Sequence, residues 1–454
     1  MSSRCLACLV ATVVSLTFQV GRRLEAQAPA TGAGAALQRF WAAPTPSQAA
    51  QVVADIVASG ISFDEALRRL RNGRPYLPQK TGVIKLSNRT EDRIVHYYAL
   101  NVPDGYDPKR RYQVRFQLHG GIGGRTGNQP VGSGEIGRLA GVEQIYVLPY
   151  GWKDAPWWSD DQVLNLQAIL DALKRSYNVD ENRVVVAGTS DGGTGAYYFA
   201  MRDTTPFASF LTLNGSIMAL TSDDMEVIGN PSPNNLRNKP LFVVNGGRDR
   251  LYPTSVIEPI IEHMKKNGVA IDYHPQPNAG HDTTWWPELK DTFEKFVTDN
   301  RRDPLPDRLT LEATLSSPFK RAHWLIIDRL GPQPDDPREL SPDVNRYHFV
   351  GRDGSETSWR LFNYKVTSGR VDLVRTGNTI EVSTKGVAEI TLLLSPDRFD
   401  FTQPVKVVAN GRLAFEGRVQ PNLKTLLKWA ARDNDRTMLF GAEVHLDLAA
   451  PRSH

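Results

Sequence analysis

The chain has 454 residues, enough for two or three domains that each bury a core. Its composition, 40% hydrophobic and 23% charged with a formal net charge of +4, is that of an ordinary soluble protein. Because no run of lysine or arginine stands out, the sequence gives no sign of a nucleic-acid partner.

The first 28 residues have the pattern of an export signal. Arg4 supplies a short positive start, the stretch from Leu6 to Val20 is mostly apolar, and Ala26-Gln27-Ala28 offers a cleavage site. The charged stretch 21–25 gives an unusual spacing, so an uncleaved N-terminal anchor is the alternative. No later run approaches the length of a membrane span. We therefore expect a secreted or periplasmic protein without an integral membrane segment beyond the signal peptide.

Both cysteines, Cys5 and Cys8, lie inside this leader. The mature chain is then expected to have no disulfide, no thiolate metal site and no cysteine nucleophile. Paired histidines at metal-binding spacing are also lacking from the sequence. We expect neither a metal nor another cofactor.

Residues 29–80 are predicted to form an N-terminal helical segment. Its Gly/Ala-rich start, 31–37, is expected to be mobile. One helix is expected to begin after the capping residue Thr45, and a second after Ser62 in an S-x-x-E capping box, ending at Gly73. The pair could be a pro-region, a lid or a brace on the main domain. We favour the brace, because nothing in it is chemically specific.

Residues 81–300 alternate between expected strands and helices. The two clearest helices, 160–177 and 255–267, carry apolar residues at helical spacing. The expected strands are 93–102, 112–118, 145–149, 183–187, 241–245 and 270–274. This alternation predicts an α/β domain with a doubly wound, mostly parallel sheet that is covered on both faces.

The segment 301–308 is charged, contains two prolines and is predicted to be a linker. After it, the alternation of strands and helices gives way to a series of short expected strands. Residues 309–454 are expected to form a β-sandwich-like domain, interrupted by one helix at 423–431. The expected strands are 324–327, 371–374, 379–382, 390–394, 405–408 and 413–416. Asn410-Gly411 between the last two strands is a strong hairpin signal.

The stretch from Val184 to Gly193 is the most informative in the chain. A β-branched strand runs directly into Gly188-Thr189-Ser190-Asp191-Gly192, and a segment of small, helix-compatible residues follows. This is the pattern of a nucleophile elbow, a turn so tight that Gly188 and Gly192 are needed where side chains would clash. Ser190 is therefore predicted to be a nucleophile, with a purely structural turn as the alternative.

A catalytic serine needs donors that stabilise the oxyanion formed during attack. The glycine-rich loop 118–124 follows a strand, and the N–H groups of Gly121 or Ile122, together with that of Asp191, are predicted to form the oxyanion hole. A dinucleotide-binding loop is disfavoured because the glycines depart from G-x-G-x-x-G spacing. His119 is predicted to hold this loop rather than to act as a second base.

The remaining catalytic groups are expected on later loops, in the order serine, acid, histidine. Asp249 lies just past the strand 241–245 and is predicted to orient the imidazole. His281 lies on the loop after the next strand and is predicted to be the base. The other histidines fall on expected helices or strands and lack this context.

These motifs are similar to those of α/β-hydrolases of the secreted esterase group, which includes polyhydroxybutyrate depolymerases, feruloyl esterases and acetyl-xylan esterases and is related to prolyl-oligopeptidase-type catalytic domains. The resemblance is carried by 118–121, 177–193, 245–249 and 280–281 and does not reach the C-terminal third. It implies that Ser190 is the nucleophile, Asp249 the acid and His281 the base. Asp191 departs from the residue common after the serine in that group, which is Asn, Met or Ala.

Four tryptophans lie on loops expected near the mouth of the site. Trp157 and Trp158 follow the third strand, and Trp285 and Trp286 follow His281. Such pairs commonly anchor the core. The alternative is a stacking wall for an aromatic or sugar-linked acyl group, and on that hypothesis the four are predicted to bind substrate.

The leading hypothesis is an exported serine hydrolase that cleaves carboxylic ester bonds of a small molecule or polymer through an acyl-enzyme. A serine peptidase with the same triad is one alternative, although the β-rich domain is C-terminal, unlike the N-terminal propeller of the larger peptidases. A binding protein on a hydrolase scaffold, with the β-rich domain as the working part, is the other.

Overall fold

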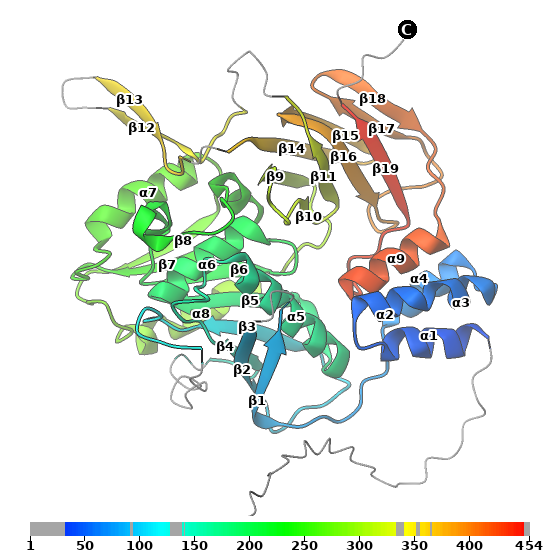
Figure 1. Cartoon of the computed structure of the whole chain (residues 1–454), viewed down its shortest axis with the longest axis horizontal. Helices are drawn as coiled ribbons and strands as arrows, with labels where there is room; N and C mark the ends of the chain where they lie inside the picture. The colour runs from blue at the N-terminus through cyan, green and yellow to red at the C-terminus, as the bar shows by residue number, and fades with distance from the viewer. Residues whose placement is uncertain are drawn as a thin grey trace, which may run out of the picture.

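The computed structural model describes residues 32–90, 94–127, 139, 141–332, 340–350, 355–363 and 366–448. The export signal expected at 1–28 lies outside the described residues. A group of N-terminal helices, an α/β region with one large sheet and a C-terminal region with smaller sheets follow one another along the chain (Figure 1). No helix among the described residues is both long and apolar enough to span a membrane.

An eight-stranded sheet, ordered β1-β2-β4-β3-β5-β6-β7-β8, forms the centre of the α/β region. Its strands are β1 (Gly82–Arg89), β2 (Val95–Val102), β3 (Tyr112–Leu118), β4 (Ile145–Pro149), β5 (Val179–Thr189), β6 (Ser209–Leu213), β7 (Leu241–Gly246) and β8 (Ile271–Gln276). The pairs that involve β2 are antiparallel, and all others are parallel. The doubly wound, mostly parallel sheet expected from the sequence is therefore confirmed.

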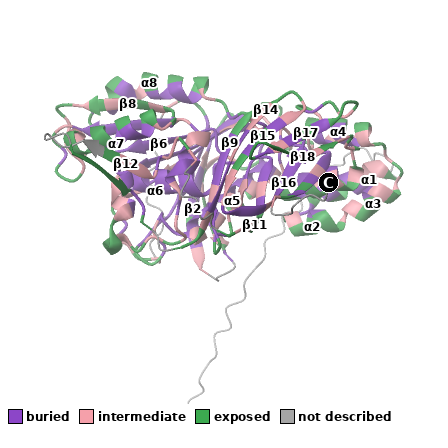
Figure 2. Ribbon diagram, turned by 90° about the horizontal axis from the view of Figure 1, so that it is seen from above, coloured by how far each residue is buried: buried purple, intermediate pink, exposed green. Residues whose placement is uncertain are grey.

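Helices cover both faces of this sheet, as its continuous apolar strands require. In β5, Val184 and Val186 join the core beneath α5 (Asp160–Ser176), α6 (Asp191–Arg202) and α7 (Thr254–Lys266). The alternate residues Val185 and Ala187 pack toward α8 (Trp286–Asp299) on the opposite face. Figure 2 shows the outward faces of α7 and α8 as exposed. Three short 3-10 helices connect β6 to β7: η2 (Ile217–Thr221), η3 (Asp223–Met225) and η4 (Pro233–Asn238).

Three elements of this region were not predicted: β1, β6 and α8. The edge strand β1 is mostly exposed and half of its residues are polar, so its apolar signal is weaker than that of its neighbours. β6 has only five residues, and α8 begins at a tryptophan with a proline next to it instead of at a capping side chain. In each case the local sequence signal is weak and the tertiary packing decides the structure.

The N-terminal helices are α1 (Ala33–Ala42), α2 (Pro46–Gln51), α3 (Val53–Ala58) and α4 (Phe63–Asn72). The expected caps form: Thr45 accepts a hydrogen bond from the Gln48 amide, and Ser62 accepts one from the Glu65 amide. The prediction of a mobile start is wrong for residues 33–37, because they begin α1, where Leu37 is fully buried.

These four helices pack on α9 (Leu423–Asp433), a helix of the C-terminal region, and not chiefly on the α/β region as we expected of a brace. Leu67 and Leu70 of α4 share one apolar cluster with Leu426 and Leu427 of α9. Figure 1 shows the first helices, in blue, beside this late helix, in orange-red. Helices from early and late in the chain thus share one apolar core.

The C-terminal region contains two sheets that enclose a common apolar core, as expected of a sandwich-like arrangement. One sheet comprises β10 (Arg321–Ala322), β11 (Leu325–Leu330), β16 (Val387–Leu394) and β19 (Ala442–Asp447). The other comprises β18 (Arg412–Gly417), β17 (Val405–Ala409), β15 (Thr379–Lys385), β14 (Ser368–Thr376) and β9 (Arg308–Thr314). A separate hairpin of β12 (Arg346–Val350) and β13 (Glu356–Arg360) projects from the body (Figure 1).

The turn between β17 and β18 is the hairpin predicted at Asn410-Gly411. Asn410 and Gly411 both adopt positive φ, 50° and 75°, and connect antiparallel strands. Two consecutive residues in the left-handed region are the signature of the type I′ turn, which Asn-Gly favours.

The segment 301–308, predicted to be a linker, is anchored where the two regions meet. The side chain of Arg302 is fully buried and donates hydrogen bonds to Asn182 of the α/β region and to Asp435 and Thr437 of the C-terminal region. A buried guanidinium with these partners fixes one region against the other.

Candidate active site

The turn that carries Ser190 has the geometry of a nucleophile elbow. Ser190 lies between β5 and α6 with φ 57° and ψ −121°, a strained backbone for a residue other than glycine. A Cβ atom on Gly188 would lie 2.0 Å from the carbonyl oxygen of Gly192, and one on Gly192 would lie 2.2 Å from that of Leu118. These contacts explain why the sequence has glycine on both sides of the serine.

Ser190, His281 and Asp249 form a hydrogen-bonded chain. The Ser190 hydroxyl donates to His281 Nε2 at 2.8 Å, and His281 Nδ1 donates to Asp249 Oδ2 at 2.7 Å. The Asp249 side chain is fully buried, whereas the His281 side chain is 26% exposed. The structure thus brings together the three residues predicted from chain order. The imidazole of His281 lies between the Ser190 hydroxyl and the buried carboxylate of Asp249.

Backbone contacts hold the acid and the base in place. Asp249 Oδ1 accepts hydrogen bonds from the amides of Leu251 and Tyr252, at 2.8 and 3.1 Å. The acid loop is also joined to the histidine loop, because the Arg248 amide donates to the carbonyl of Ala279 at 2.9 Å. The positions of both groups therefore depend on main-chain geometry more than on side-chain packing.

The glycine-rich loop lies against the elbow, but its amides differ in availability. The Ile122 amide donates to the Asp191 carboxylate at 2.8 Å, whereas no hydrogen bond to another described residue engages the Gly121 amide. Gly121 has φ 64°, a conformation that glycine adopts without strain. Of the two alternatives that the sequence left open for the first oxyanion donor, Ile122 has its amide engaged by the Asp191 side chain, whereas the Gly121 amide has no partner among the described residues.

His119 is buried beneath this loop. Its Nδ1 donates to the Gly120 carbonyl at 2.9 Å, and its Nε2 accepts from the Gly151 amide at 3.1 Å. The ring also packs against Trp157, with centroids 5.1 Å apart. With both nitrogens engaged by the backbone, His119 has a structural role and is not available as a second base.

The four tryptophans predicted to bind substrate are all buried, with exposures from 0 to 8%. The indole N–H groups of Trp157, Trp158 and Trp285 donate to the backbone carbonyls of His119, Met225 and Asp282, respectively. Trp286 packs edge-on against Phe293 under α8. The stacking-wall hypothesis is therefore wrong for this structure, because these rings anchor loops from inside the core.

Sequence reasoning missed two groups of residues around the triad. The ring of Tyr252 lies edge-on to His281, with centroids 5.9 Å apart; burial raises the pKa of its phenol, and the Asp191 charge adds to that shift. Asn214, with φ 50°, donates to the carbonyl of Asp282, the residue after the base. Hydrogen bonds from the Thr284 side chain and amide lower the pKa of Asp282 and fix the same loop. No local motif marks these residues, since each is brought to the site only by the fold.

Part of the chain is similar in sequence to known esterases. The chain is 25% identical over 203 residues to a protein described as probable feruloyl esterase C from Aspergillus terreus, covering 43% of this chain and 70% of that protein. It is 30% identical over 148 residues to probable feruloyl esterase C from Aspergillus clavatus, covering 30% of this chain and 50% of that protein. No family model matches the chain.

Among solved structures, one described as ferulic acid esterase is 17% identical, with a TM-score of 0.37, and covers 49% of this chain and 99% of that one. A likeness this weak has no bearing on function. The sequence relatives, together with the central sheet, support an α/β-hydrolase fold similar to that of esterases and an activity on carboxylic esters.

Proposed function

We propose that this protein hydrolyses carboxylic esters through Ser190, His281 and Asp249 and a covalent acyl-enzyme. The observation that carries the proposal is the continuous hydrogen-bonded chain from the Ser190 hydroxyl through His281 to buried Asp249. A hydroxyl whose proton faces an imidazole nitrogen, with the other nitrogen held by a carboxylate, has the arrangement that activates a serine nucleophile.

In the first half-reaction, Ser190 Oγ attacks the acyl carbon while His281 Nε2 takes the hydroxyl proton. The carbonyl oxygen becomes an oxyanion, which the Gly121 and Asp191 amides stabilise. His281 then gives its proton to the departing alcohol as the C–O bond breaks. In the second half-reaction, water loses a proton to His281 and attacks the acyl-enzyme, releasing the acid and regenerating Ser190.

For the acyl group, we propose a hydroxycinnamate such as ferulate, on the basis of the two relatives described as probable feruloyl esterases. The matches to them cover 43% and 30% of this chain. The four buried tryptophans do not supply a stacking surface for that acyl group. The ester specificity therefore needs a direct test.

The test compares methyl ferulate, nitrophenyl acetate, nitrophenyl butyrate and a peptide nitroanilide as substrates of the wild type, Ser190→Ala and Ser383→Ala. Ser383 is an exposed serine on β15 and serves as the matched control. We expect ester hydrolysis by the wild type and Ser383→Ala, and a loss of about 10³-fold or more in Ser190→Ala. Equal activity of wild type and Ser190→Ala would overturn the triad, and preference for the amide would make the protein a peptidase.

We also propose that the protein is exported by its first 28 residues, on the basis of the apolar run and Ala26-Gln27-Ala28. N-terminal sequencing of protein expressed from the full-length sequence in an exporting host tests this. A new N-terminus at Pro29 is expected, and recovery of the whole chain in the membrane fraction would favour the uncleaved anchor.

A further inference from the structure

The elbow exposes a carboxylate next to the proposed nucleophile. Ser190 and Asp191 are both partly exposed, whereas every residue of α6 from Gly192 to Arg202 is buried. Asp191 is the first residue of α6, so its carboxylate lies at the positive end of the helix dipole. The two side chains that a substrate can reach at the start of this helix are therefore a hydroxyl and a negative charge.

The glycine-rich loop contacts both of these side chains. A Cβ atom on Gly120 would lie 3.4 Å from Ser190 Oγ, and the Ile122 amide donates to Asp191 Oδ2 at 2.8 Å. Gly121, whose amide is a proposed oxyanion donor, is the residue between these two contacts. Because neighbouring Cα atoms are about 3.8 Å apart, a carbonyl oxygen held by the Gly121 amide lies close to the Asp191 carboxylate.

The charge of Asp191 has few partners. Its carboxylate accepts one hydrogen bond, from the Ile122 amide, and no ion pair joins it to any residue that the structure describes. Asp249, in comparison, accepts two backbone amides and contacts His281. A partly exposed carboxylate with one neutral donor keeps a negative potential at the surface that it faces.

A cation of the glycine-rich loop is directed elsewhere. The Arg125 guanidinium donates to the Gly121 carbonyl at 3.2 Å and lies over the Tyr150 ring, 5.8 Å from its centroid. The charge of Asp191 instead acts on the triad side of the elbow. Burial raises the pKa of Tyr252, Asp191 adds to that shift, and the Tyr252 ring lies edge-on to His281.

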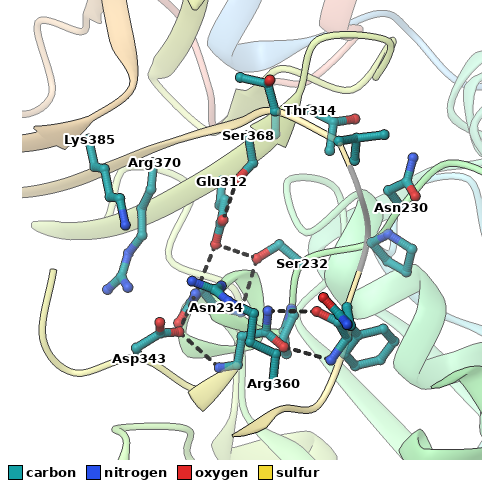
Figure 3. A pocket seen from close by; sticks show the side chains of 18 of the residues that line it. Asn230, Ser232, Asn234, Glu312, Thr314, Asp343, Arg360, Ser368, Arg370 and Lys385 are labelled. Carbon is teal, nitrogen blue, oxygen red and sulfur yellow. Dashed lines mark hydrogen bonds between the residues drawn. The ribbon is translucent and has the colours of Figure 1, made fainter. Parts of the chain in front are cut away.

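The cleft between the α/β region and the C-terminal region shows how charges elsewhere in the fold are engaged. Its volume is about 430 Å³, and Figure 3 shows its lining side chains. Glu312 accepts hydrogen bonds from the Ser232 hydroxyl at 2.6 Å and from the Asn234 amide at 2.8 Å. Arg370 pairs with Asp372 at 2.8 Å. Both charges are met by their own surroundings, in contrast to the carboxylate at the elbow.

The hydrogen bond alone does not account for a charge at position 191. An acceptor is all that the Ile122 amide needs, and a neutral asparagine would also supply one. A negative charge opposes the oxyanion that develops beside it, so it costs transition-state stabilisation on an uncharged ester. A positive group on the substrate, next to the scissile carbonyl, would offset this cost.

We propose that the Asp191 carboxylate selects substrates by charge, favouring esters with a cationic group next to the scissile carbonyl and rejecting those with an anionic group there. An ammonium on the carbon next to the carbonyl would pair with the carboxylate as the oxyanion forms. A hydroxycinnamoyl ester, which is uncharged at this position, ranks between the two classes. This selection rests on the proposed ester hydrolysis at Ser190.

The test compares three methyl esters by pH-stat titration of the released acid: those of betaine and of tert-butylacetic acid, and the monomethyl ester of malonic acid. The first two have the same shape and differ in charge, because carbon replaces the quaternary nitrogen, and the third is anionic. Each is measured with the wild type, Asp191→Asn and Asp299→Asn, an exposed position on α8 that serves as the matched control. Ratios of kcat/KM between esters, compared between proteins, cancel the intrinsic reactivity of each ester.

Asp191→Asn should lower the ratio of the cationic to the neutral ester about tenfold and raise the ratio of the anionic to the neutral ester about tenfold. Asp299→Asn should leave both ratios as in the wild type. Raising NaCl from about 0.02 M to about 0.5 M should bring the wild-type ratios toward those of Asp191→Asn, because salt screens a partly exposed charge. The salt series needs no substitution, so it remains decisive if Asp191→Asn folds poorly.

Equal ratios in the wild type and Asp191→Asn, or wild-type ratios that do not respond to salt, would overturn the selection by charge. An equal loss on all three esters would do the same, because it would leave Asp191 only its hydrogen bond to Ile122. Nitrophenyl acetate separates the two proposals. A wild type that hydrolyses it through Ser190 without any charge preference refutes the selection alone, whereas a wild type without Ser190-dependent hydrolysis refutes both.

Discussion

The catalytic edge of the large sheet and the junction between the two regions both bury carboxylates, but they satisfy them differently. Asp249 at the catalytic edge is held by two backbone amides and by an imidazole that remains partly exposed. At the junction, Asp435 is held by the fully buried guanidinium of Arg302. Burial alone would raise the pKa of Asp435, but Arg302 and Lys174 outweigh that effect and hold it below its usual value.

The partners of the two carboxylates differ because one is proposed to serve catalysis and the other serves stability. A catalytic carboxylate must work with a base that exchanges protons with the substrate and water, so its partner stays accessible. A junction carboxylate has no such need, and a permanent cation neutralises it best. Substitutions at the first edge should therefore alter turnover with little effect on unfolding, and those at the junction should do the reverse.

The largest effect is expected for Asp249→Asn. The amide can keep contact with the imidazole but favours the wrong tautomer, so kcat on nitrophenyl acetate should fall by about 10³- to 10⁴-fold. The midpoint of thermal unfolding should change little. Asp299→Asn, in the exposed last turn of α8, is the matched control and should retain full activity. A fall of less than about tenfold in kcat would contradict the role of Asp249.

At the junction, Arg302→Leu should lower the free energy of unfolding by about 3–5 kcal/mol, because it leaves buried Asp435 with only the more distant Lys174, at 3.6 Å, as a charge partner. Urea unfolding measures this, and the folded fraction should retain esterase kcat. Arg398→Leu removes a partly exposed pair with Asp303 and should cost less than about 1 kcal/mol. Similar losses in the two variants would show that the buried pair does not hold the regions together.

A smaller effect is expected at Asp191, whose side chain both holds the glycine-rich loop and carries a charge next to the proposed nucleophile. Its carboxylate holds the Ile122 amide but also places a negative charge at the elbow. Asp191→Asn keeps an acceptor and removes the charge, so its kcat should equal or exceed that of the wild type. Asp191→Ala also loses the hydrogen bond and should be about tenfold slower than Asp191→Asn. Steady-state kinetics on nitrophenyl acetate distinguish them; equal rates for the two variants would exclude a positioning role for this hydrogen bond.

The smallest effect concerns pH. Burial, with the charges of Lys239 and Arg302, holds the pKa of His323 well below its usual value. The unfolded chain therefore binds a proton below about pH 6.5 that the folded chain does not, and stability should fall by up to about 1.4 kcal/mol per pH unit below that point.

His323→Asn should remove this contribution while tolerating the left-handed backbone at φ 52°. Urea unfolding at pH 7 and pH 5.5 measures the difference between the two proteins. An identical pH response in both would mean that other groups control acid stability.

Local sequence signals predicted much of the molecule. The strands β3 and β4 were predicted with their observed bounds, and so were the caps at Thr45 and Ser62, because each depends on residues within a few positions. The chain order of serine, aspartate and histidine predicted three residues that the fold brings into contact. Their roles in catalysis remain proposals.

The burial of Trp157 and the start of α1 are two features that the local sequence did not predict. Trp157 packs in the core of the α/β region and its indole N–H finds a partner in the carbonyl of His119, and no pattern near residue 157 contains that information. Residues 33–37 are helical because Leu37 and its neighbours find an apolar partner in α9, near the other end of the chain. Periodicity within a short, Gly/Ala-rich stretch cannot indicate such a partner.

By itself, then, the sequence determined the elbow at Ser190 and the chain order of the proposed triad, because tight turns and strand-to-loop transitions require particular residues at fixed spacing. Only the tertiary structure decided that Asp191 engages the Ile122 amide, which groups bury the tryptophans and how Ser232, Glu312 and Arg370 line one cleft. These features join residues far apart in the chain, and the free energy that selects such contacts comes from burial and charge pairing across the whole fold.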